Sequence, residues 1–100
     1  MSAKAPPKDA EEKIPFVFNF QPDMETSESI SSALLTVAVV AGADGNPAAM
    51  LDGASSIVGG LVRQRIMGGI TGNTYRVRCK VTLSSGNVFV LAGLLPIREA

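Results

Sequence analysis

The stretch that decides the fold runs from Ile66 to Gly86 and reads IMGGITGNTYRVRCKVTLSSG. Its glycines, at positions 68, 69 and 72, allow a tight reversal, because glycine adopts positive φ without a steric penalty. From Tyr75 onward apolar and basic residues alternate, which is the period of a β-strand with one buried face. The residues predicted to face the core are Tyr75, Val77, Cys79, Val81 and Leu83. The opposite face is predicted to carry Arg76, Arg78, Lys80 and Thr82.

The rest of the chain repeats this character, with short β-prone segments separated by turn residues such as Asp44-Gly45 and Asn46-Pro47. The segment 29–42 is long enough for one long strand or for two strands joined at a bend. The predicted strands cover residues 14–20, 29–42, 56–58, 61–67, 75–83 and 87–97. About six to seven antiparallel strands without a long helical pattern predict an all-β fold, either a β-sandwich or a small barrel.

The chain is divided by composition near residue 13. Residues 1–13 are rich in Pro, Lys, Ala and Glu and have no periodicity, so we expect a flexible N-terminal arm. This arm either solvates the protein or becomes ordered on a neighbour. Residues 14–100 are expected to form the β domain, which is one domain's worth of chain.

The composition weighs against an enzyme. The 100 residues include no histidine and a single cysteine, Cys79. The commonest general base and the usual zinc ligands are therefore missing, and the carboxylates show no paired spacing. We expect no catalytic residue, no metal and no cofactor, and we expect Cys79 to be inert in the core. The longest apolar stretch, residues 33–43, is too short to span a bilayer as a helix, so no membrane is expected.

Gly72 and Tyr75 have a further interpretation as a structural corner. A glycine turn followed by a tyrosine at the start of a strand resembles the tyrosine corner of immunoglobulin-like sandwiches. There the hydroxyl bonds to backbone of the loop that crosses between the sheets, because a buried phenol needs a polar partner. The alternative is a tyrosine that fills the core with its hydroxyl in water.

The basic residues of the second half form a candidate interaction face. Residues 1–52 include three basic and eight acidic residues, which gives this half a net charge of −5. Residues 53–100 include six basic residues and one acidic residue, which gives a net charge of +5. If segments 61–67 and 75–83 are neighbours, one patch would collect Arg63, Arg65, Arg76, Arg78 and Lys80. Three uses remain open: a solvated sheet face, a salt-bridging protein surface, or phosphate contact. Binding to nucleic acid is the least favoured of these uses, because no aromatic residue lies between the basic residues and the net charge of the chain is zero.

These segments together resemble a family of small proteins of tailed bacteriophages and prophages, the fibre–tail adaptor proteins. The shared features are an aromatic strand at 16–20, an Ile-Ser-Ser segment at 30–32, a Gly-Gly-x-x-Gly-x-x-Tyr turn at 68–75 and a Thr-x-Ser-x-Gly hairpin at 82–86. The resemblance covers most of residues 14–97. The first strand lacks the tryptophan and acidic residues that are common in the family.

The resemblance implies an immunoglobulin-like sandwich that serves as a virion structural protein at the head–tail junction, tail or fibre base. Its implied partners are other phage virion proteins of the tail, neck or fibre, with a homo-oligomeric ring as the implied assembly. The implied location is the virion, assembled in the cytoplasm of the bacterial host. The alternative function is a carbohydrate- or nucleic-acid-binding β-sandwich module.

Overall fold

Two β-sheets form the structure, a computed structural model that describes residues 2–4 by their backbone and residues 8–99 in full. The strands are β1 (Ser2–Lys4), β2 (Ile14–Asn19), β3 (Ile30–Ala41), β4 (Ser56–Val58), β5 (Leu61–Ile66), β6 (Thr74–Leu83) and β7 (Val88–Pro96). Two 3-10 turns, η1 (Gln21–Asp23) and η2 (Pro47–Met50), lie in the connections.

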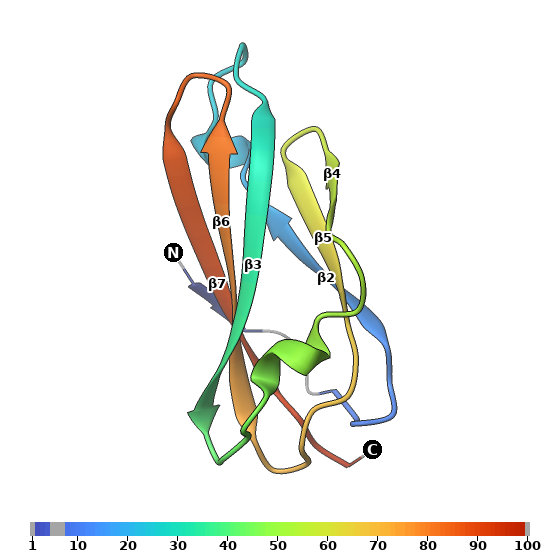
Figure 1. The fold of residues 1–100 in the computed structure, drawn as a ribbon. Helices are drawn as coiled ribbons and strands as arrows, with labels where there is room; N and C mark the ends of the chain where they lie inside the picture. The colour runs from blue at the N-terminus through green and yellow to red at the C-terminus, as the bar shows by residue number, and fades with distance from the viewer. Residues whose placement is uncertain (1, 5–7, 100) are drawn as a thin grey trace.

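The two sheets pack face to face (Figure 1). The larger sheet has the order β1-β7-β6-β3 and the smaller one the order β2-β5-β4. All pairings are antiparallel except that of β1, which runs parallel to β7. The all-β prediction is therefore confirmed, and the strands β2 to β7 of residues 14–100 pair antiparallel as expected. The parallel strand β1 lies in the predicted arm, where no strand was expected. No periodic pattern in the sequence marked this three-residue strand.

The core lies between the sheets and is built on the alternation of β6. Tyr75, Val77, Cys79 and Val81 are fully buried, and the residues between them are exposed or half-buried. The smaller sheet contributes Phe16 and Phe18, whose ring centroids lie 5.0 Å apart. Burying each large apolar side chain stabilises the fold by roughly 1.5–3 kcal/mol before entropy is counted. The inward pattern of β6 is therefore what fixes the orientation of its outward residues.

Part of the predicted N-terminal arm lies against the larger sheet. Residues 1 and 5–7 of that arm lie outside the described residues, whereas β1 pairs with β7 at Ala92–Leu94. The Lys8 amide donates to the Pro96 carbonyl at 2.9 Å, and its buried Nζ donates to the Gly68 carbonyl at 2.8 Å. Burial lowers the pKa of the Lys8 ammonium, and the nearby Glu12 and Asp9 oppose that shift. The division at residue 13 stays a prediction, but the described residues of this segment contribute to sheet pairing and to a buried contact.

Candidate functional site

The outward face of β6 presents a row of three cations. Arg76, Arg78 and Lys80 alternate with buried residues and are all exposed. Because β6 lies between β3 and β7, this row runs along the middle of the larger sheet. In the part of the chain that the structure describes, none of these three side chains has a hydrogen bond or ion pair. The row is therefore a line of positive charge that no described residue pairs with.

Apolar side chains flank this row on both sides. On β3, Leu34 lies opposite Lys80 and is 59% exposed. On β7, Val90 lies opposite Lys80 and is 36% exposed, with Val88 beyond it at 49%. We call this surface the cationic face; its outward residues are Leu34, Thr36, Ala38, Arg76, Arg78, Lys80, Val88, Val90 and Ala92. Charge and exposed apolar area therefore share one continuous surface.

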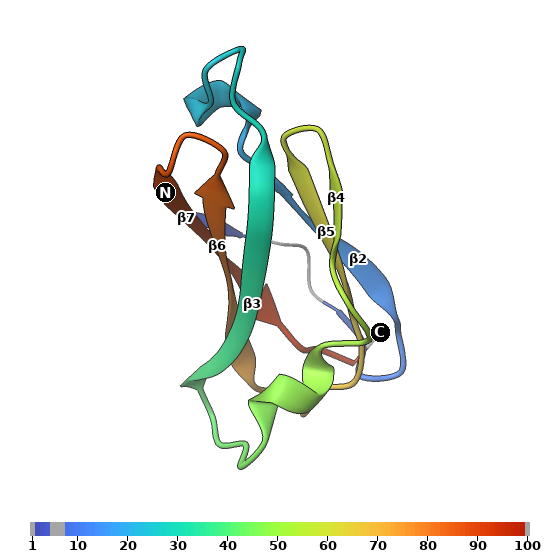
Figure 2. The ribbon, with the colours of Figure 1, turned by 45° about the horizontal axis from the view of Figure 1, so that its top comes forward.

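Arg63 and Arg65 do not belong to this surface. They are exposed on β5, which pairs with β2 and β4 in the other sheet, whereas β6 pairs with β3 and β7. The two outer surfaces lie on opposite sides of the molecule (Figure 2). The expected single patch of five cations is therefore wrong, because segment 67–73 crosses from one sheet to the other instead of closing a hairpin.

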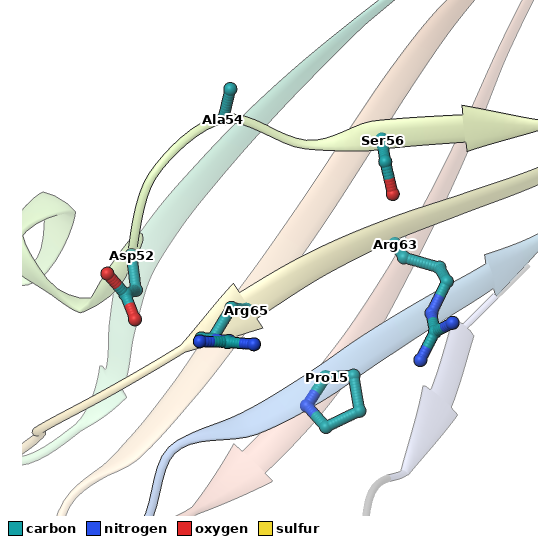
Figure 3. Close-up of a pocket in the computed structure, with 6 residues that line it drawn as sticks. All are labelled: Pro15, Asp52, Ala54, Ser56, Arg63 and Arg65. Carbon is teal, nitrogen blue, oxygen red and sulfur yellow. The ribbon is translucent and has the colours of Figure 1, made fainter.

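The pair on β5 lines a shallow depression of about 390 Å³. Figure 3 shows Arg63 and Arg65 on β5, with Pro15 on β2 and Ser56 on β4 beside them. Asp52 and Ala54 complete the lining from the segment before β4. The depression is polar and its lining includes the carboxylate of Asp52. The positive charge of Arg63 and Arg65 therefore has an acidic side chain nearby, whereas the β6 row has none among its flanking residues.

Tyr75 forms a polar cluster at the crossing between the sheets. Its hydroxyl accepts hydrogen bonds from the Ile70 amide at 3.0 Å and from Asn73 Nδ2 at 3.2 Å, and it donates to Asp44 Oδ2 at 2.9 Å. Gly72, at φ +95°, allows the turn, and its amide donates to the Ile97 carbonyl at 2.9 Å. The role of Gly72 and Tyr75 as a structural corner stays a prediction, which a substitution at Tyr75 tests.

Cys79 lies on the inward face of β6 and is 0% exposed. Desolvation raises the pKa of its thiol from 9.0 to about 11. A shift of that size lowers the thiolate fraction at pH 8 by about a hundredfold.

We therefore expect a thiol-specific disulfide reagent at pH 8 to modify the folded protein on the order of a hundred times more slowly than the urea-unfolded chain. The same shift predicts that stability falls as pH rises from 9 toward 11, because only the unfolded chain ionises its thiol there. Comparing urea unfolding at pH 8 and pH 10.5 isolates this effect, because Cys79→Ala should lose less stability than the unmodified protein. Equal losses would contradict a desolvated thiol.

The described residues offer little to other kinds of ligand. No group of three or more His, Cys, Asp or Glu side chains among them is placed to hold a metal ion. None of their helices is long and apolar enough to cross a membrane. The aromatic residues Phe16, Phe18, Phe20 and Tyr75 are buried and Phe89 is half-buried, so they form no exposed stacking platform.

The sequence interpretation missed the apolar flanks of the cationic face. Leu34 alternates with core residues of β3, and Val88 and Val90 alternate with the half-buried Phe89 and Leu91 of β7. The available signal was that residues 33–41 are uncharged on both faces of the predicted strand. A strand of that kind has either both faces covered or one apolar face exposed.

The structure is that of a small all-β protein with two packed sheets. Its outer surfaces carry cations and exposed apolar side chains. The chain belongs to a family of phage structural proteins, since the family model Gp77, described as "Podophage GP4 fiber-tail adaptor protein gp77", matches residues 8–95. No curated protein matches the chain.

Proposed function

We propose that the protein is a non-enzymatic adaptor that joins tail and fibre components of the virion through its cationic face. The observation that carries the proposal is the row Arg76, Arg78 and Lys80, unpaired within the described residues and flanked by the exposed Leu34 and Val90. Family membership supplies the setting, because the family is described as linking fibre and tail.

The composition of this face fits a protein partner. Protein interfaces combine apolar contacts at their centre with arginine, and exposed apolar side chains gathered on one face mark an interaction site. A partner with acidic side chains would pair with the row and cover the apolar flanks in the same contact. Solubility alone does not explain why Leu34 is 59% exposed beside the charges, because an exposed leucine does not increase solubility.

The proposed fold is the immunoglobulin-like sandwich. Its support is the strand order: β2-β5-β4 corresponds to strands B, E and D of that fold, and β7-β6-β3 corresponds to G, F and C. Tyr75 also stands at the start of the strand that corresponds to F, after the loop that corresponds to E–F, where immunoglobulin-like domains have their tyrosine corner.

The proposed setting is a virion protein that assembles in the host cytoplasm as a homo-oligomeric ring at the head–tail junction, neck, tail or fibre base. A closed ring needs one surface of each copy to complement a different surface of the next. The cations of the sheets and the acids of the loops supply opposite charges on one molecule. In this proposal the ring forms through loop and face contacts.

Hydroxyl-radical footprinting of the free protein and of the assembled tail tests the proposed binding surface. We expect Leu34, Val88 and Val90 to lose at least about half of their reactivity on assembly, because interface cores exclude water. Val17 and Val58 are the matched controls, since they are 47% and 64% exposed on the other sheet. Protection of Val17 and Val58 with unchanged Leu34 and Val90 would overturn the proposal.

A further inference from the structure

The open edge of the larger sheet is unusual among the edges of this fold. β3 is 12 residues long and contains no charged residue and no proline. Among the described strands it pairs on one side only, with β6. The other edge strands have features that disfavour pairing with a further strand: β1 and β4 have three residues each, and β2 contains Pro15. Long, uncharged edge strands are templates for another strand, which is why proteins usually protect them. η2 lies beside the C-terminal end of β3 (Figure 2), and no described strand pairs with the outer side of β3.

The backbone direction of β3 follows from contacts of β6. The Leu83 amide donates to the Asn87 carbonyl at 2.8 Å, so odd-numbered residues of β6 direct their backbone groups toward β7. The Thr82 carbonyl accepts from Ser31 Oγ at 2.8 Å, which places the even-numbered groups toward β3. Because Thr36 lies opposite Arg78, its backbone groups point to β6, and those of Leu35 and Val37 point to the open edge.

The register also places the charges within reach of that edge. Arg78 lies opposite Thr36, and Arg76 lies opposite Ala38. These two β3 side chains are small, so the arginines can extend across them. A strand added to β3 would lie about 10 Å from β6, two strand spacings away, a distance that an arginine and a glutamate side chain span together.

The geometry points to an extended acidic segment of a neighbouring virion protein that adds to the free edge of β3 and pairs its carboxylates with Arg76, Arg78 and Lys80. The three cations are two residues apart, so the segment needs Asp or Glu at alternate positions, the period of a strand. The inference rests on the proposed function, because it names the chemistry of the partner of the same face.

A second copy of this chain does not supply such a strand. All nine acidic residues of the chain lie outside its strands, at positions 9, 11, 12, 23, 25, 28, 44, 52 and 99. Pairing two β3 edges would instead bring two cationic rows onto one sheet with no acid between them. The charge pattern therefore assigns the edge to a different, acidic protein.

Binding of a labelled ten-residue peptide of alternating threonine and glutamate tests the inference, with the threonine–lysine peptide as its counterpart. We expect fluorescence anisotropy to show binding of the acidic peptide alone. Thr36→Glu should raise its Kd at least about tenfold, because the new carboxylate neutralises Arg78 and repels the peptide. Thr36→Gln has the same shape without the charge and should leave the Kd within about twofold.

Amide hydrogen exchange separates strand addition from simple charge attraction. We expect the Leu35 and Val37 amides to exchange more slowly when the peptide is bound. Unchanged exchange at these amides, equal binding of both peptides, or no binding of either would overturn the inference. So would a dimer, seen by sedimentation, whose β3 amides are protected without peptide. If the inference fails while footprinting still protects Leu34 and Val90 in the assembled tail, the proposed function stands.

Discussion

Replacing Tyr75 by phenylalanine is expected to lower the free energy of unfolding by about 2 kcal/mol and the melting temperature by roughly 10 °C. The ring still fills its fully buried position, so the change removes the hydroxyl alone. That hydroxyl accepts from the Ile70 amide and from Asn73 Nδ2 and donates to Asp44. Its loss removes the hydrogen bond of the Ile70 amide and one of the two bonds of Asn73 Nδ2, which also donates to the Ala43 carbonyl. Unsatisfied groups of this kind cost more than a hydrogen bond gains.

Asp44→Ala is the comparison for this substitution. It removes the acceptor of the hydroxyl proton, and with it the exposed bond that Asp44 Oδ1 accepts from the Asn46 amide at 2.9 Å, but it keeps the two donors to the hydroxyl oxygen bonded. We therefore expect a smaller loss, about 1 kcal/mol. Equilibrium urea unfolding of both variants measures the difference. If Tyr75→Phe were as stable as the unmodified protein, the hydroxyl would have no structural role and the predicted corner at Gly72 and Tyr75 would be contradicted.

The local pattern of β6 could be predicted from the sequence because its information is local. Alternation between Tyr75 and Leu83 specifies an extended strand with one buried face, and the structure has β6 at Thr74–Leu83 with that face inward. The same reasoning located β2 through Phe16 and Phe18. In each case the side-chain period alone determines both the element and its exposed residues.

The sheet to which each strand belongs could not be predicted in the same way. β5 and β6 both alternate basic and buried residues, and segment 67–73 between them has a length that fits either a hairpin or a crossing. The choice depends on long-range contacts: β5 pairs with β2, more than forty residues earlier in the chain, and Lys8 reaches the Gly68 carbonyl. The position of Arg63 and Arg65 on the opposite surface follows from that choice.

The largest effect on binding is expected from reversing the charge of the β6 row. Arg76→Glu combined with Arg78→Glu replaces two cations at the centre of the cationic face by two acids. Repulsion of an acidic partner and the loss of two ion pairs should together raise the Kd by about a hundredfold, near 3 kcal/mol. Both residues are exposed, so the fold should be retained. Binding by the unmodified protein should weaken as salt is added, and the double variant should lose most of this dependence.

The matched control is Arg63→Glu combined with Arg65→Glu, since these residues have the same spacing and exposure on the other sheet. The decisive measurement is binding of each double variant to the purified tail and fibre proteins of the same phage, with light scattering for the mass of the assembly. The account predicts that Arg76 and Arg78 are required for binding and for the full mass of the assembly. Reversing Arg63 and Arg65 should change the Kd by about threefold at most. Full binding and unchanged assembly mass with Arg76 and Arg78 reversed would contradict it.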